Sequence, residues 1–404
     1  MTLPDRLSAD WLTAPASRAV MAALEAARPG GARYVGGCVR NTLRGLPADD
    51  IDVATQIPPE GVMAALTDAG IRALPTGIEH GTVTAIHDGV PVEITTLRRD
   101  VETDGRRAVV AFTEDWAEDA ARRDFRMNAI YAGADGALHE VIPGSVEDAL
   151  AGRVIFIGDG DQRLIEDYLR ILRFYRFNAW YGAGIDAEGQ AACGRQKFGL
   201  AKIAAERIWK ELKRTLAAPD PSAALLAMEE AGVLGEVLPS ASAALLPGLV
   251  AAEIEAGLDP DPMRRLMALL PRRQRDAGET AAHLKLSNEE SSRLSGWADA
   301  ALPHVLGAGE GAVAEAFYRF GPAAALDRAA IEAASGAGGD LGGVVRLAAH
   351  WQRPKFPLGG ADALSAGLKG PAIGEALGRL EEAWIASGFT LSREALLSQL
   401  RHPD

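Results

Sequence analysis

Two patterns of hydrophobic and polar positions share the first 150 residues of the chain. Short apolar runs typical of strands occupy Ala32 to Val35 and Asp50 to Ala54, and a helical pattern runs from Pro58 to Ala69. Two further runs, Thr82 to His87 and Val90 to Leu97, are separated by Asp-Gly, which predicts a β-hairpin. We therefore expect a mixed sheet with helices in this part of the chain.

Beyond Gly160 the apolar residues recur almost everywhere at helical spacing. Helices are predicted over Gln162 to Trp180, Ala201 to Ala217 and Ala223 to Ala231, with Pro- and Gly-containing turns between them. The glycine-rich segment Ser335 to Gly343 is predicted to be a flexible linker. The expected fold class is an α+β head followed by an all-α, multi-helix C-terminal part.

A length of 404 residues suggests two to four domains, since a domain has roughly 150 residues. The patterns divide the chain into four parts. The expected parts are a head over residues 1–150, a helical neck over residues 151–217, a helical body over residues 218–334 and a helical tail over residues 335–404.

Composition and charge exclude several classes of protein. Lysine and arginine number 42 against 55 aspartates and glutamates, a net charge of −13, so a polyanionic partner requires a local basic surface. The two cysteines, Cys38 and Cys193, lack a pairing motif or metal-ligand spacing. No apolar run reaches about 18 residues without a charge or proline, and the first residues do not resemble a signal peptide. We expect a cytoplasmic protein without membrane contact.

A Gly-Gly turn lies at Gly36 and Gly37, where the first predicted strand ends and a helix starts. Glycines let the backbone approach a ligand closely, and the N–H groups at a helix start favour anions such as phosphate. Taken alone, such a turn is more often structural than functional.

A pair of carboxylates follows at Asp50 and Asp52. Side chains alternate along a strand, so both acids share one face while Ile51 and Val53 enter the core. Two adjacent carboxylates repel unless a divalent cation neutralises them, although a solvated strand end is the simpler explanation. Together with the Gly-Gly turn, they provide a phosphate cradle and a Mg²⁺ site, which is what nucleotidyl transfer requires.

A polar stripe runs along the helix predicted from Gln162, formed by residues spaced three apart: Asp167, Arg170, Arg173 and Arg176. A carboxylate and a guanidinium one turn apart present an acceptor and a planar donor fork to the edge of a base. An ordinary pair between Glu166 and Arg170 on a solvated helix is the alternative, but it leaves the later arginines without a role.

Residues 30–215 resemble the class II tRNA nucleotidyltransferases, which add the CCA end to tRNA, and the related bacterial poly(A) polymerases of the polymerase-β-like superfamily. The resemblance is carried by five motifs: Gly36 to Asn41, Asp49 to Thr55, Val92 to Asp100, Ala121 to Ile130 and Glu166 to Phe177. The segment Leu368 to Leu397 also resembles the tail of many bacterial members. One departure is Asn41, where the family usually has Asp, so an ion pair that aligns the turn is expected to be weaker.

The resemblance implies a role for each motif residue. Asp50 and Asp52 are the expected catalytic residues and ligands of Mg²⁺. Asp167 and Arg170 are expected to read the base of CTP or ATP. The remaining expected nucleotide-binding residues are Gly37, Arg40, Arg123, Arg173 and Arg176, with Arg123 at the phosphate or ribose, Asp124 and Asn128 supporting the ribose site, and Arg173 and Arg176 at the triphosphate.

Three segments near these motifs have two interpretations each. Glu93 is a third acid of the superfamily or a charge on a solvated strand face. Residues 98–107 form a polar loop, used by the family in the switch from C to A addition, or an ordinary solvated loop. Arg122 to Asp124 stand at the start of an amphipathic helical stretch, as part of the nucleotide site or as a surface charge network.

Contact with RNA requires basic surface outside the head. Basic residues concentrate in three runs, Arg207 to Arg214, Met263 to Arg265 and Pro271 to Arg275. Each run alone is more often a solvated helix face, but in combination with this head they are expected to follow the phosphates of a folded RNA.

The expected function is therefore template-independent addition of CMP and AMP to the 3′ end of tRNA, from CTP and ATP, with release of pyrophosphate. The expected partners are tRNA and the two nucleotides, with no DNA. The alternatives are an A-adding or C-adding tRNA nucleotidyltransferase or a poly(A) polymerase, and a non-catalytic RNA-binding protein.

Overall fold

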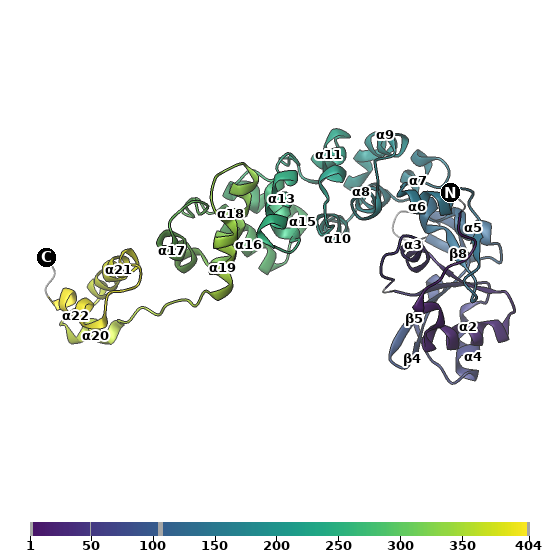
Figure 1. The fold of residues 1–404 in the computed structure, drawn as a ribbon, viewed down its shortest axis with the longest axis horizontal. Coiled ribbons are helices and arrows are strands. Elements are labelled where there is room, and N and C mark those ends of the chain that lie inside the picture. Colours follow the sequence, from purple (N-terminus) through teal and green to yellow (C-terminus); the bar gives the residue numbers. More distant parts are fainter. Residues whose placement is uncertain (1–2, 49, 104–107, 402–404) are drawn as a thin grey trace. The chain divides into compact units, whose positions relative to one another are not determined.

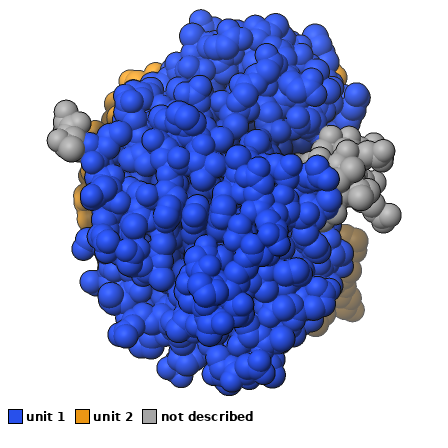
Figure 2. Space-filling view, turned by 90° about the vertical axis from the view of Figure 1, so that its right-hand side faces the viewer, with its two compact units in different colours: residues 1–239 blue, residues 240–404 orange. Residues whose placement is uncertain are grey.

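The chain forms two compact units, residues 1–239 and residues 240–404 (Figure 2). The computed structural model describes residues 3–48, 50–103 and 108–401. No helix within those ranges combines the length and the apolar composition that a membrane span requires. Both units have buried apolar cores of their own.

One mixed sheet forms the centre of the head (Figure 1). Its strands are β1 (Ala32–Val35), β2 (Asp52–Thr55), β3 (Arg72–Gly77), β4 (Thr82–His87), β5 (Val90–Thr96), β8 (Ile130–Ala132) and β9 (Leu138–Glu140), in the order β3-β4-β5-β2-β1-β8-β9. Only β2 and β5 are parallel among these neighbours; the other pairs are antiparallel. The predicted strands and the β4–β5 hairpin are confirmed, although β2 begins at Asp52 and not at Asp50.

Two helices cover one part of the sheet, where α2 (Pro15–Ala27) and α4 (Pro59–Asp68) pack on each other and on β4 and β5. Val20, Leu24, Val62 and Leu66 are almost completely buried in this layer, as the helical spacing of apolar residues requires. The other helices of the head are α1 (Asp10–Thr13), α3 (Gly37–Leu43), α5 (Trp116–Ala121) and α6 (Ser145–Ala151).

Residues 98–103 do not form the loop expected from their polarity. They make β6 (Arg98–Thr103), which pairs with β7 (Ala108–Phe112) in a separate two-stranded sheet. The β-branched residues of both strands, together with Phe112 of β7, favour the pairing. Residues 104–107, which were part of the predicted loop, lie outside the described residues.

The prediction of a helical stretch after Asp124 was also wrong. The chain forms only a short 3₁₀ turn (Arg126–Asn128) before it enters β8. Phe125, Met127 and Ile130 are buried because Phe125 bridges to Phe156 and Ile130 pairs in the sheet, so strand-like contacts override the helical spacing.

Helices form the rest of the first unit: α7 (Gly160–Glu166), α8 (Leu169–Tyr181), α9 (Ala187–Gln196), a 3₁₀ segment η3 (Lys197–Lys202), α10 (Ala205–Leu216), α11 (Ser222–Glu230) and α12 (Val233–Val237). The predicted helix from Gln162 is interrupted at Asp167. The Asp167 carboxylate accepts a hydrogen bond from the Leu169 N–H at 3.0 Å, and such a local bond competes with helix continuation.

The second unit is helical throughout its described part. Its helices are α13 (Leu246–Ala256), α14 (Pro262–Leu269), α15 (Gln274–Leu284), α16 (Asn288–Ala298), α17 (Glu310–Phe320), α18 (Pro322–Ala334), α19 (Leu341–His350), α20 (Gly360–Ser365), α21 (Pro371–Ala386) and α22 (Arg393–Arg401). The α+β head and the helical remainder agree with the expected fold class.

The predicted linker, Ser335 to Gly343, is not a spacer between separate parts. Its last residues begin α19, which packs on α18 and α13. Asp340 caps this helix by accepting a hydrogen bond from the Gly343 N–H at 2.8 Å. The longest connection without helix in this region is residues 351–359, after which α20 to α22 pack around Trp384 and Leu396. Glycine content alone therefore misplaced the linker.

Candidate active site

A cavity of about 580 Å³ opens between the head and the neck helices of the first unit. Seven arginines and three aspartates line it, although the whole chain has a net charge of −13. The lining residues are Gly36, Gly37, Arg40, Asp52, Arg98, Arg122, Arg123, Asp124, Asn128, Asp167, Leu169, Arg170, Arg173, Phe177 and Arg207. Such a local excess of positive charge attracts a polyanion such as a nucleoside triphosphate.

The acidic side of the cavity lies at the start of β2. Asp52 is directly opposite Glu93 of the parallel strand β5, so both side chains project from the same face of the sheet. Burial, reinforced by the charge of Glu93, raises the pKa of Asp52 to about 6. Asp50 is exposed, precedes the strand and does not line the cavity. The structure thus brings Asp52 and Glu93 together and leaves Asp50 at the edge.

The Gly-Gly turn has the backbone that its sequence predicts. Gly36 precedes α3 with a φ of 74°, a conformation that favours glycine, and α3 begins at Gly37. A Cβ atom at Gly36 would lie 3.7 Å from the Arg123 guanidinium, and one at Gly37 would lie 3.9 Å from that of Arg40. Bare backbone therefore faces the cavity next to two cations.

Two amide oxygens hold the guanidinium of Arg40. Asn41 Oδ1 accepts from Arg40 Nε at 3.1 Å and from Nη2 at 2.8 Å, and Asn128 Oδ1 accepts from Nη1 at 2.5 Å. The guanidinium also lies 3.9 Å from the centroid of the Tyr181 ring. Arg40 is 5% exposed, and its burial lowers its pKa. None of these bonds supplies a negative charge, so the charge of Arg40 stays available to a ligand.

Asn41 does more than replace an acceptor. Arginine has only donors, so the oxygen of Asn41 must face Arg40, which leaves its Nδ2 to donate to the Pro47 carbonyl at 2.7 Å. An aspartate could not donate this second bond. The turn is therefore held without the ion pair whose loss was expected to weaken it, and Asn41 also anchors Pro47.

A chain of hydrogen bonds joins this turn to α8. Asn128 Nδ2 donates to Asp124 Oδ1 at 3.0 Å, and Arg173 Nε donates to Asp124 Oδ2 at 2.8 Å. Although burial disfavours its charged form, the neighbouring Arg173 holds the pKa of Asp124 below its ordinary value. Arg40, Asn128, Asp124 and Arg173 thus form one continuous network across the cavity.

Asp167 and Arg170 lie on the helical side of the cavity, and their side chains do not bond to each other, although the Arg170 N–H donates to the Asp167 carbonyl at 3.0 Å. Arg170 donates to Glu166 Oε2 at 2.7 Å and to the carbonyls of Arg163 and Arg122. The Glu166–Arg170 pair considered as an alternative therefore exists, but Arg170 still lines the cavity. Asp167 is 30% exposed, and its Oδ2 lies 3.5 Å from Arg207 Nη2.

Two predicted residues have strong partners within the protein. Arg176 does not line the cavity; its Nε donates to Glu211 Oε2 of α10 at 2.6 Å, and its side chain is 13% exposed. Arg123 lines the cavity but its Nη2 lies 3.1 Å from the buried Asp119, which also binds Arg122. The charge network that was the alternative interpretation of Arg122 to Asp124 is therefore present, because Asp119 binds both Arg122 and Arg123.

Comparisons with known proteins identify the family. The family model described as "Poly A polymerase head domain" matches residues 32–155. The model described as "Probable RNA and SrmB- binding site of polymerase A" matches residues 184–245. The mitochondrial CCA tRNA nucleotidyltransferase 1 of Mus musculus is 33% identical over 387 residues, which cover 91% of this chain and 86% of its own. The chain belongs to the CCA tRNA nucleotidyltransferase family. The resemblance read from the motifs and the predicted enzyme class are confirmed.

Solved CCA-adding enzymes share the fold. The Bacillus stearothermophilus enzyme in complex with CTP superimposes with a TM-score of 0.73 at 24% identity and covers 96% of this chain and 97% of its own. The Thermotoga maritima enzyme complexed with tRNA superimposes with a TM-score of 0.70 at 16% identity and covers 99% of both chains.

Sequence reasoning missed Arg207, which lines the cavity, and Arg163, which binds the backbone of two cavity residues. Arg207 was assigned to an RNA-binding run, yet it lies beside Asp167. Arg163 was not singled out, although its Nη2 donates to the carbonyls of Arg122 and Arg123 at 2.5 and 2.7 Å. The available signal for Arg163 was its position one helical turn before Glu166, with which it pairs.

The run Met263 to Arg265 does not offer the surface expected for RNA in this family member, and the run Pro271 to Arg275 offers it only in part, because Arg273 and Arg275 are exposed while Arg272 is bound within the unit. Arg264 and Arg265 are 5% and 1% exposed and bind the buried Glu253. Arg272 donates to the carbonyls of Trp297 and Leu302 at 2.9 Å each, at the end of α16. These arginines pair inside the unit, which their positions in the sequence did not reveal.

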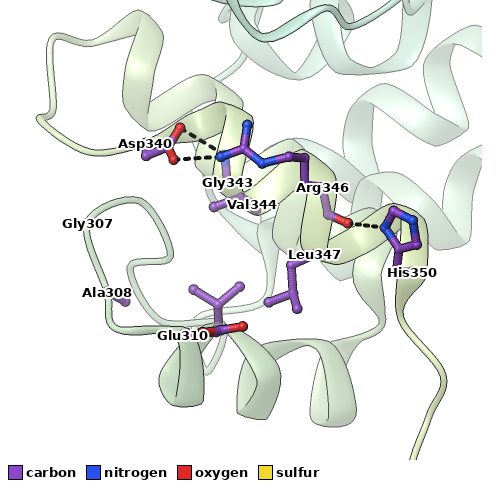
Figure 3. A pocket seen from close by; sticks show the side chains of 10 residues that line it. Gly307, Ala308, Glu310, Asp340, Gly343, Val344, Arg346, Leu347 and His350 are labelled. Atoms are coloured by element: carbon purple, nitrogen blue, oxygen red, sulfur yellow. Dashed lines mark hydrogen bonds and ion pairs between the residues drawn. The ribbon is translucent and has the colours of Figure 1, made fainter.

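A second cavity, of about 480 Å³, lies in the second unit between α17 and α19 (Figure 3). Val313, Val344 and Leu347 contribute its apolar lining. At its rim Arg346 lies 3.0 Å from Asp340, and the His350 ring nitrogen Nδ1 lies 2.9 Å from the Arg346 carbonyl. No residue predicted for the nucleotide site contributes to this cavity.

Proposed function

We propose that the cavity of the first unit adds CMP and AMP to the 3′ end of tRNA, using CTP and ATP and releasing pyrophosphate. The observation that carries the proposal is the meeting of the strand carboxylate Asp52, a Gly-Gly turn and seven arginines in one cavity of an acidic chain. The names of the related proteins, and the CTP and tRNA in the related structures, support the same substrates.

The proposed metal is Mg²⁺, with Asp50 and Asp52 as ligands. The pKa of Asp52 is raised to about 6 by burial and the charge of Glu93, in spite of the opposing charge of Arg123, and such a group is stabilised by a divalent cation. Among the described residues no three His, Cys, Asp or Glu side chains are grouped as a metal site. Mg²⁺ is commonly held by one or two carboxylates plus substrate phosphates, so Asp52 fits it, and Asp50, which does not line the cavity, is the second proposed ligand. When bound, it supplies charge neutralisation at the reacting phosphate.

The arginines around the turn are proposed to bind the triphosphate. Arg40 has its charge unneutralised, and Gly37 presents backbone close to it. Arg123 and Arg173 line the same space, each anchored by a carboxylate that fixes its position. Arg176 faces Glu211, so we assign it the role of fixing α8 on α10 and thereby aligning Arg173.

Base selection is proposed for Asp167 and Arg170. The break in the helix at Asp167 turns its carboxylate away from the regular helical ladder, while Arg170 is fixed by three acceptors. A fixed acceptor and a fixed donor fork present one hydrogen-bonding edge to the incoming base. Because the protein and not a template strand offers this edge, CTP and ATP can be chosen without a template.

The parts of the chain are proposed to divide the work. The head of residues 1–150 carries catalysis, the neck of residues 151–217 carries base recognition, and residues 218–334 and 335–404 bind tRNA. The matched RNA-binding model over residues 184–245 supports RNA contact from the neck onward. The second unit, which begins at Ser240, is compact by itself and can present a preformed surface.

We propose a cytoplasmic location. Cys38 and Cys193 are both buried free thiols, which is the usual state in a reducing compartment. The related mouse protein is named as mitochondrial, so the organelle is the alternative. Cell fractionation followed by immunodetection separates the two locations.

The function is tested with a labelled tRNA that lacks its CCA end. We expect two additions with CTP alone, none with ATP alone and three with both nucleotides. A-only or C-only addition would replace the proposal with one of the single-nucleotide activities, and a long A tail would indicate a poly(A) polymerase. Tight tRNA binding without incorporation would indicate a non-catalytic RNA-binding protein.

A further inference from the structure

An exposed aromatic ring lies in η3, next to the neck helices. Phe198 is 68% exposed, more than any other phenylalanine or tryptophan among the described residues. A ring of this size that stays exposed gives up the free energy that burial of its apolar surface would contribute to folding. Proteins that bind single-stranded nucleic acid use aromatic side chains as surfaces on which successive bases stack.

Cations flank this ring and its neighbour. The ammonium of Lys197 lies 5.4 Å from the centroid of the Phe198 ring, and that of Lys202 lies 5.1 Å from the centroid of the Tyr168 ring. Phe198 and Lys202 are both exposed. Alternating rings and ammonium groups match the alternating bases and phosphates of single-stranded RNA.

Tyr168 connects this surface to the nucleotide cavity. It follows Asp167, which lines the cavity, and its ring rests directly against Gly199 of η3. A Cβ atom at Gly199 would lie only 1.9 Å from a ring carbon of Tyr168, so a glycine is required for this contact. The backbone next to Phe198 is thereby held against Tyr168, the residue that follows Asp167.

We propose that Phe198, Lys197 and Lys202 bind the unpaired 3′ end of the RNA substrate. One base stacks on the Phe198 ring, and the two ammonium groups contact adjacent phosphates. The inference rests on the proposed function and names a subsite within it. It is supported by the matched RNA-binding model, which spans residues 184–245 without singling out any of these three.

The test compares Phe198→Leu, which keeps an apolar side chain, with Phe198→Tyr, which keeps the ring. We expect Phe198→Leu to raise the KM for tRNA about tenfold, the effect of losing one stacked base, and to leave the KM for CTP unchanged. Phe198→Tyr is expected to retain the wild-type KM for tRNA. Val90→Ala, at an exposed apolar position of β5, is the control and is expected to change neither constant.

Binding is also measured without chemistry, with a fluorescent base analogue at the 3′ end of the tRNA and no nucleotide present. We expect the wild type and Phe198→Tyr to quench the fluorescence, and Phe198→Leu to quench it weakly. This arm remains informative even if wild-type incorporation fails, an outcome that would refute only the proposed function. Equal quenching by all variants overturns the proposal, and so does a loss of self-association in Phe198→Leu with an unchanged KM for tRNA, which would indicate a protein contact.

Discussion

The charged side chains on the two sides of the nucleotide cavity have opposite kinds of neighbour: like charges on the strand side and opposite charges on the helical side. On the strand side, Asp52 lies beside Glu93, and their mutual repulsion adds to the effect of burial on Asp52. On the helical side, Arg170 and Arg173 are each bound to a carboxylate of the protein. The acids therefore form an unsatisfied site that gains from a cation, whereas the arginines form a rigid frame that keeps its shape without a ligand.

The largest effect is expected on the strand side. Asp52→Asn keeps the size of the side chain and removes its charge, so CMP incorporation should fall by about 10²–10³-fold, as when one preorganised electrostatic group is lost. Steady-state incorporation into tRNA lacking its end measures this, with circular dichroism to verify the fold. Asp68→Asn, at an exposed position of α4, is the control; if its loss equals that of Asp52→Asn, the assignment of Asp52 is wrong.

On the helical side, removing an arginine should reduce the stability of the folded protein. Arg173→Met leaves the buried Asp124 without its ion pair, and we expect a loss of about 2–3 kcal/mol in the free energy of unfolding. This is below the full cost of breaking a buried pair because Arg173 is 32% exposed. Urea denaturation measures it. Arg195→Met, at an exposed pair with Asp161, should reduce the free energy of unfolding by no more than about 1 kcal/mol. Equal losses in the two variants would contradict the conclusion that Arg173 is part of a rigid frame.

Base selection should fail separately from phosphate chemistry. Asp167→Ala or Arg170→Ala should reduce the preference for CTP over UTP by about tenfold to a hundredfold, the value of one bidentate base contact. The readout is the ratio of kcat/KM for the two nucleotides. Wild-type discrimination among all four nucleotides in both variants would remove these residues from base recognition.

Without added divalent cation, the strand side should also destabilise the protein above pH 6. The pKa of Asp52 is raised from 3.8 to about 6 in the folded state, so the folded protein holds this proton more tightly and its stability falls as pH rises between these values. Asp52→Asn removes this penalty, about 1 kcal/mol for a partly exposed group, and should melt about 2–4 °C higher than wild type at pH 8. The difference should disappear at pH 3.5; a variant that melts lower at pH 8 would show that Asp52 is already compensated.

The smallest effect concerns Asn41. Asn41→Asp neutralises Arg40 and loses the bond to the Pro47 carbonyl, so the KM for CTP and for ATP should rise by the same factor, about threefold for a loss near 0.65 kcal/mol. The preference between nucleotides should not change. Tighter binding of CTP by Asn41→Asp would mean that the charge of Arg40 is not used by the triphosphate.

The sequence predicted those parts of the site that depend on short-range rules. The Gly-Gly turn, the alternation that exposes Asp52, and the hairpin that brings Glu93 to it follow from backbone preferences and strand periodicity. The helix break at Asp167 did not, because a single side-chain bond to the Leu169 N–H outweighs the helical pattern.

The ion pairs between residues far apart in the sequence could not be predicted, for a different reason. Whether an arginine reaches solvent depends on which acid the fold places beside it, and the partners are far away in sequence. Arg176 binds Glu211, Arg264 binds Asp327, and Arg207 lies beside Asp167. The run Met263 to Arg265 therefore predicted an RNA surface where the second unit instead has buried ion pairs.

The most direct test of the account is whether one carboxylate site serves both nucleotides. CMP addition to tRNA that lacks its whole end and AMP addition to tRNA that lacks only its last nucleotide are measured side by side with wild type and Asp52→Asn. The account predicts that both rates fall by the same factor, so that their ratio remains that of the wild type. Retention of either addition in Asp52→Asn would contradict a single shared active site in the head.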